Sequence, residues 1–119
     1  VFPDGRAFGL NTYPPRADGT THNDGFIYQD GRMYKARARN AAFLRNIQPL
    51  GDDVAVELES DLGITRIAGT TILSTFHMGQ PEVNGMNLQQ GAVRYEWDGI
   101  GTIGMIERSI SSEQCTIIL

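Results

Sequence analysis

Apolar and polar residues alternate along most of the chain, and glycines or Asp-Gly pairs separate the alternating segments. Val54, Val56 and Leu58, for example, occupy one face of an extended strand, while Glu57 and Glu59 occupy the other. Long apolar stripes with a helical period are scarce. The pattern predicts about seven or eight antiparallel strands with turns roughly every 8–12 residues, which is typical of a β-sandwich or a β-barrel.

The segment GFIYQDGRMYKARAR contains an Asp-Gly pair between two alternating runs. Such a pair favours a type I′ turn, because both central residues of that turn have positive φ. A two-residue turn at Asp30-Gly31 places Tyr28 opposite Met33 and Ile27 opposite Tyr34. We therefore expect a tight hairpin here.

Other segments carry weaker signals. Asp61-Leu62-Gly63 turns the chain into a β-branched run, in which Gly69 marks a bend or a bulge. Residues 40–47, NAAFLRNI, are expected to form one or two helical turns, and residues 80–90 are looser and polar. The loop PPRADGTTHND is the one candidate linker.

A second hairpin, VRYEWDGIGTIGMIERS, is unusually rich in glycine. Val93, Tyr95 and Trp97 share one face of its first strand. An even loop, Asp98-Gly99 or residues 98–101, places Tyr95 and Trp97 with Gly104 and Ile106. Glu107 then lies beside Arg94 and Glu96, and an ion pair with Arg94 is expected.

An odd loop, residues 98–100, places Glu107 among Tyr95, Trp97 and Met105 instead. A carboxylate on that face would need a partner, or its pKa would rise, which would make it a candidate acid or ligand anchor. A structural ion pair at the rim is the alternative. The sequence leaves both loops open.

Size and charge limit the function classes. The 119 residues predict one domain, 1–119, and the net charge of −4 does not provide a broad basic surface for nucleic acid. Lys35, Arg37, Arg39 and Arg45 form a local basic run that we interpret as a solvated strand face. Because no apolar run is long enough for a membrane helix, no membrane span is expected.

The single cysteine, Cys115, excludes an intramolecular disulfide and agrees with a reducing, cytoplasmic location. Its position, fifth from the end, does not fit a prenylation box. Because the chain opens on Val1 within a strand-like segment, we expect it to be part of a longer protein.

Catalytic and metal-binding signatures are missing from the sequence. There is no GxSxG, Walker loop, HExxH or paired CxxC, and no helix follows the glycines of the second hairpin to hold a dinucleotide. The loop with Asp18, His22, Asn23 and Asp24 has oxygen donors but not the spacing of a calcium loop. No metal and no cofactor are expected.

The segment GMNLQQGAVRYEWDGIGTIGMIERS resembles the closing hairpin of the two-domain lipocalin-like proteins grouped with hydroxyneurosporene synthase and related hydratases. The match consists of Trp97-Asp98-Gly99 followed by a return from Gly101 to Glu107, about a quarter of the chain. It implies a C-terminal lipocalin-like domain with a cup for an isoprenoid, steroid or fatty molecule. Of the family's catalytic residues, the resemblance suggests only Glu107.

The sequence thus predicts an all-β antiparallel fold, a lipocalin-like barrel or half-barrel, with a two-sheet β-sandwich as the alternative. The expected function is binding of a hydrophobic small molecule, as part of a hydratase- or isomerase-like enzyme; whether the chain itself is catalytic stays open. The alternative is a non-catalytic β-module that contacts a second β domain or a homodimer partner. The candidate ligand-binding residues are Tyr28, Tyr34, Phe76, Arg94, Tyr95, Trp97 and Met105. Glu107 and His77 are the candidates for a catalytic role, and a hydrogen-bonded structural histidine is the alternative for His77.

Overall fold

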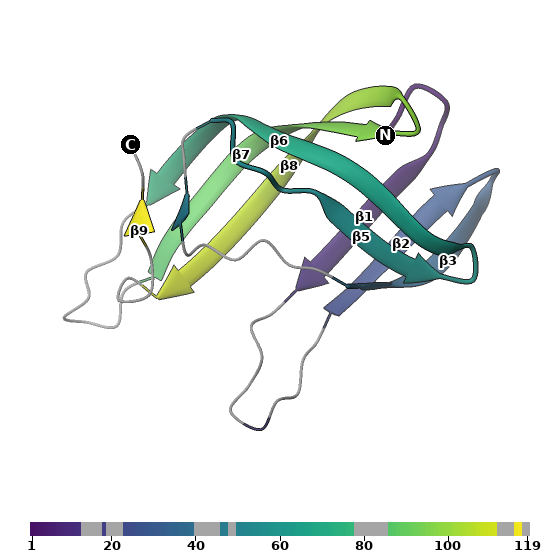
Figure 1. The fold of residues 1–119 in the computed structure, drawn as a ribbon, viewed down its shortest axis with the longest axis horizontal. Coiled ribbons are helices and arrows are strands. Elements are labelled where there is room, and N and C mark those ends of the chain that lie inside the picture. Colours follow the sequence, from purple (N-terminus) through teal and green to yellow (C-terminus); the bar gives the residue numbers. More distant parts are fainter. Residues whose placement is uncertain are drawn as a thin grey trace. The chain divides into compact units, whose positions relative to one another are not determined.

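The computed structural model describes residues 1–12, 18, 23–39, 46–47, 50–77, 86–111 and 116–117. All regular secondary structure in these residues is β-strand (Figure 1). The strands are β1 Ala7–Thr12, β2 Asn23–Gln29, β3 Arg32–Ala38, β4 Asn46–Ile47, β5 Val56–Ser60, β6 Gly63–His77, β7 Met86–Trp97, β8 Ile100–Ser111 and β9 Thr116–Ile117.

Seven of the strands form one antiparallel sheet in the order β1-β2-β3-β5-β6-β7-β8. The two short strands β4 and β9 pair in parallel as a second sheet. The predicted all-β antiparallel class is confirmed. A two-sheet sandwich would divide the long strands between two sheets, whereas one continuous sheet is the connectivity of a barrel or half-barrel.

Two hairpins of the sheet have the same turn. The strand bounds leave only Asp30-Gly31 between β2 and β3, and only Asp98-Gly99 between β7 and β8. All four residues have positive φ, with values of 54° and 74° in the first turn and 52° and 80° in the second. These are the backbone angles of type I′ turns. The register of β2 and β3 pairs Tyr28 with Met33 and Ile27 with Tyr34, as predicted.

The β5–β6 hairpin confirms the predicted turn at residues 61–63, since Ser60 pairs with Gly63, whose φ is 92°. The interruption in β6 lies farther along than expected. Thr71 is buried and Ser74 bonds to a buried glutamine, while the two residues between them are exposed. One extra residue thus enters the alternation at Ile72–Leu73, as in a β-bulge. Gly69 has a packing role instead.

Two expectations about local structure need correction. Asn46 and Ile47 belong to the extended strand β4, so the expected helical segment does not include them; residues 40–45 lie outside the described part. Residues 86–90, expected to be loose, form the first part of β7. Gln89 explains this, because its buried side chain has polar partners that a sequence pattern does not reveal.

The described residues pack into two compact units. The first unit contains Val1–Ala41, Ala55–Ala68 and Glu96–Thr102, and the second contains Ala42–Val54, Gly69–Tyr95 and Ile103–Leu119. The buried side chains of the first unit are apolar: Phe2, Ile27, Ala38, Val56, Leu58, Ile67 and Trp97. Those of the second unit are Val54, Val93 and Tyr95 together with three polar residues, Thr71, Gln89 and Arg108. The two units therefore have different kinds of core.

Candidate functional site

The β7–β8 hairpin shows which of the loop lengths left open by the sequence is correct. Its loop has two residues, so the even alternative holds, and Glu107 does not join the aromatic face. Two side-chain contacts support this register: Gln90 Nε2 lies 3.5 Å from Glu107 Oε2, and Arg108 Nε lies 2.7 Å from Gln89 Oε1. Glu107 is exposed and contacts Gln90. The expected ion pair with Arg94 is not among those of the described residues.

Tyr95 occupies a notch made by two glycines. A Cβ atom on Gly69 would lie 2.9 Å from the Tyr95 ring, and one on Gly104 would lie 2.8 Å from it. Only glycine lets the backbone approach an aromatic ring so closely. Tyr95 is 6% exposed, so its ring fills this part of the second unit.

Trp97 is packed in the first unit in a similar way. Its ring is 4% exposed and meets the Phe2 ring edge-on, with 5.5 Å between the ring centroids. The Arg6 guanidinium stacks on the indole at 4.2 Å from its centroid, a cation–π contact. The two aromatics that were expected to line a ligand cup are therefore in contact with protein groups.

A polar network lies on the buried face of the second unit. Arg108 donates from Nε to Gln89 and from Nη2 to Asp52 Oδ2, at 2.6 Å. Gln89 donates in turn to Ser74 Oγ at 2.8 Å. The Asp52 backbone N–H donates to the hydroxyl of Thr71. The charge of Arg108 is thus balanced by one carboxylate and held by a chain of neutral groups.

Tyr95 lies close enough to this network for its ionisation to be affected. Burial raises the pKa of the Tyr95 phenol, and the positive charge of Arg108 partly offsets that rise. The phenol is consequently neutral near pH 7.

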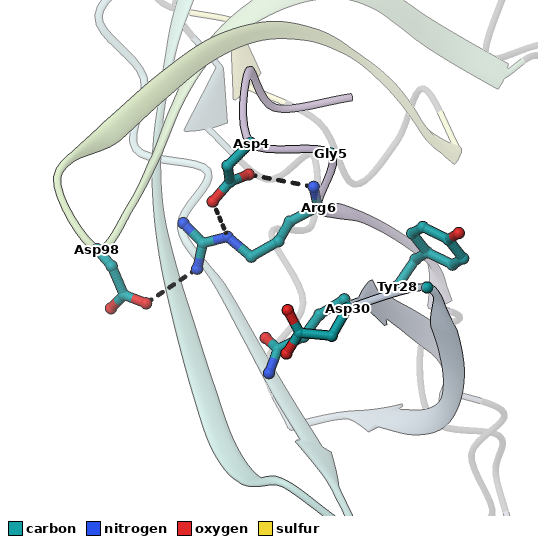
Figure 2. A pocket seen from close by; sticks show the side chains of 8 residues that line it. Asp4, Gly5, Arg6, Tyr28, Asp30 and Asp98 are labelled. Carbon is teal, nitrogen blue, oxygen red and sulfur yellow. Dashed lines mark hydrogen bonds and ion pairs between the residues drawn. The ribbon is translucent and has the colours of Figure 1, made fainter.

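The first unit has a polar hollow beside its hairpin turns (Figure 2). Arg6 points between two aspartates there: its Nε lies 2.6 Å from Asp4 Oδ2 and its Nη1 lies 2.9 Å from Asp98 Oδ2. Nη2 also donates to the Trp97 carbonyl at 3.0 Å. Tyr28 and Asp30 line the same hollow. These contacts tie the N-terminal segment to the β7–β8 turn and give Arg6 a structural role.

The opposite face of β6 and β8 exposes large apolar side chains. Met105 is 81% exposed, Leu73 68% and Ile103 51%; we call these three residues the apolar patch. Counting from the turn, Ala92 of β7 lies opposite Met105. Arg94 and Glu107 are exposed on the same face of β7 and β8.

The structure thus divides the predicted ligand-binding residues between surfaces. Tyr95 and Trp97 are buried, whereas Arg94 and Met105 are exposed on the other face of the same hairpin. In the β2–β3 hairpin, Tyr28 is 38% exposed. Tyr34 of the same hairpin stacks under the Arg32 guanidinium, which lies 5.1 Å from the centroid of its ring. Phe76 is half-buried, and the side chain of His77 lies outside the described part. Their grouping around one ligand stays a prediction from the sequence.

The predicted basic run is partly described. Lys35, Arg37 and Arg39 are exposed on or just after β3, and Arg39 Nε lies 3.6 Å from a Glu57 carboxylate oxygen and 3.8 Å from a Glu59 one. This confirms a solvated face for these three residues, of which Arg39 is paired with glutamates; Arg45 lies outside the described part.

Sequence reasoning missed the Arg108–Asp52 pair. One signal was present, because an even loop places Arg108 on the face of Tyr95 and Trp97. Nothing in the spacing indicates Asp52, which is 56 residues away in a segment without regular alternation. Only the folded chain brings the two side chains together.

Comparison with known proteins adds no assignment. No protein-family model matches the chain, and no curated protein or solved structure matches it significantly. Among the residues that the structure describes, no helix is long and apolar enough to cross a membrane. Function must therefore be argued from the chain's own surfaces.

Proposed function

We propose that this chain is a non-catalytic protein-interaction module, which contacts another polypeptide through β8 and the apolar patch. The observation that carries the proposal is the contrast in exposure between two sets of residues. Tyr95 and Trp97, expected to hold a ligand, are 6% and 4% exposed, whereas Met105 is 81% exposed. Large apolar side chains that stay exposed on one face of a sheet are typical of protein-contact surfaces.

Two further observations support a non-catalytic role. The buried arginine of the second unit is balanced by Asp52 and Gln89, and burial favours the neutral form of the nearby phenol. In the described part of the first unit, Arg6 is likewise held by two aspartates and a carbonyl. Binding of an isoprenoid, steroid or fatty molecule, and the likeness to the hydratase family, stay predictions from the sequence.

Trp97 makes the two functions distinguishable, because it is the only tryptophan and lies on the buried face. Its emission is measured while oleate, farnesol or a sterol is added. The interaction module predicts no saturable change. A saturable shift that persists in Met105→Lys would overturn the proposal in favour of ligand binding.

The exposed face is tested with the apolar dye 1-anilinonaphthalene-8-sulfonate. Met105→Glu should lower the dye's fluorescence enhancement several-fold, because it replaces the most exposed side chain of the apolar patch with a charge that repels the dye's sulfonate. Met33→Glu is the matched control, since Met33 is 64% exposed on β3 in the first unit. Equal loss in both variants, or none in either, would contradict a binding surface at Met105.

A further inference from the structure

We infer that the partner is a second copy of this chain, joined through antiparallel pairing of β8 with β8; this inference rests on the proposed interaction function. The first observation is the position of β8 at the end of the sheet order, with β7 as its hydrogen-bonded neighbour in the described part of the chain. An edge strand presents unpaired N–H and C=O groups to any strand that approaches.

The two edges of the sheet differ in how well they resist pairing. β1 at the other edge has six residues, and short edge strands pair poorly. β8 has twelve residues, and its first seven, IGTIGMI, contain no charge and no proline. Natural edge strands are normally protected by lysine, proline or a bulge. The edge formed by β8 therefore lacks these protective features and is suited to pairing with a further strand.

The type I′ turn fixes which backbone groups are available. Trp97 and Ile100 flank a two-residue turn, and such a pair exchanges both backbone hydrogen bonds. Alternation from that pair turns the N–H and C=O groups of Ile103 and Met105 away from β7. The same two residues carry exposed side chains of the apolar patch. One approaching strand can therefore pair with their backbone groups and also contact their side chains.

The charged residues near β8 favour a second copy of the chain as the partner, and they favour one register of the two β8 strands. A two-fold axis at Met105 sets Met105 against itself and Glu107 of the second copy opposite Ile103. Ile103 has Arg94 as its β7 neighbour, so each copy's glutamate approaches the other's arginine. An axis at Gly104 would instead bring Glu107 opposite Gly101, whose β7 neighbour is Glu96. The axis at Met105 is thus electrostatically favoured.

The oligomeric state is the first test. Sedimentation velocity at high micromolar concentration should give twice the chain mass of 13.1 kDa for the wild type. Met105→Lys should give the monomer, because two lysines would meet at the axis, and Met33→Lys should stay dimeric. A wild type that is monomeric, or a dimer that survives Met105→Lys, would overturn the inference.

Cysteine cross-linking tests the register in a Cys115→Ser background, which removes the native thiol. Two Cα atoms at position 105 would be about 5.5 Å apart in a hydrogen-bonded antiparallel pair, within disulfide range. Met105→Cys should therefore oxidise to a covalent dimer. Ile103→Cys should not, since its two copies are offset by four residues, about 14 Å. The reverse result would refute the axis.

The outcomes separate this inference from the proposed function. A monomeric wild type whose dye binding still depends on Met105 rejects the second copy and retains the interaction surface. A saturable ligand effect on Trp97 that persists in Met105→Lys rejects the interaction function, whatever the oligomeric state.

Discussion

At the scale of the residue, Arg108 is the least expected side chain in the second unit. Its side chain is only 7% exposed, yet an isolated guanidinium is costly to remove from water. The 2.6 Å contact with Asp52 and the 2.7 Å bond to Gln89 offset that cost. A buried ion pair of this kind stabilises little relative to an apolar pair, but losing one partner leaves the other charge without compensation.

Arg108→Met and Asp52→Asn should therefore each lower the free energy of unfolding by about 3–5 kcal/mol. In the double variant the loss should be smaller than the sum, because neither charge is left alone. Urea denaturation of the three variants measures this. Arg66→Met is the control: Arg66 is 74% exposed beside Glu57, so its loss should cost about 0–1 kcal/mol. Additive losses at Arg108 and Asp52 would argue against a coupled pair.

At the scale of the element, the two Asp-Gly hairpins rest on backbone conformation. Added Cβ atoms at Gly31 and Gly99 would meet no atom within 4 Å, so a side chain there causes no clash. The positive φ of both residues is nevertheless a conformation that L-residues avoid. The cost of replacing these glycines is consequently local and conformational.

Gly31→Val should lower the free energy of unfolding by roughly 1 kcal/mol or more, and Gly99→Val by a similar amount. Thermal unfolding measured by circular dichroism checks both. Asp30→Asn is the matched control in the same turn, because asparagine tolerates positive φ. A Gly31→Val protein as stable as the wild type would mean that the turn relaxes without cost.

The same hairpins show how far a sequence predicts an element. Asp30-Gly31 determines both the turn and the pairing of Tyr28 with Met33, because the signal is local. At Asp98-Gly99 the next glycine follows two residues later, so loops of two, three or four residues all fit the sequence. The faces of Glu107 and Arg108 depend on that choice, so the sequence alone leaves them open, whereas the strands themselves follow from local alternation.

At the scale of the whole molecule, Tyr95 links stability to pH. Burial raises its pKa above the ordinary value of 10.0 in the folded chain. The unfolded chain then loses this proton at lower pH than the folded one. The neutral Tyr95 phenol therefore stabilises the folded chain fully at any pH below the pKa that it has in the unfolded chain. That stabilisation is lost as the pH rises through the pKa that it has in the folded chain.

The melting temperature should therefore fall more steeply with pH above about pH 10 in the wild type than in Tyr95→Phe. A series of melting curves in alkaline buffers compares the two slopes, and the lower pH points give each protein's own baseline. Parallel slopes would show that Tyr95 ionises alike in the folded and unfolded chains.

The sheet order also bears on how the chain folds during synthesis. Every neighbour in the seven-stranded sheet is the preceding strand in the chain, apart from the skipped β4. Each new strand thus pairs with a strand that precedes it closely, although residues 39–55 separate β3 from β5. Pairing between consecutive strands lowers the contact order and favours rapid pairing for a β-protein. The pair β4–β9 is different, because Asn46 cannot pair until Thr116 has been synthesised. An emerging chain could form its sheet strand by strand, leaving the parallel pair as the final step.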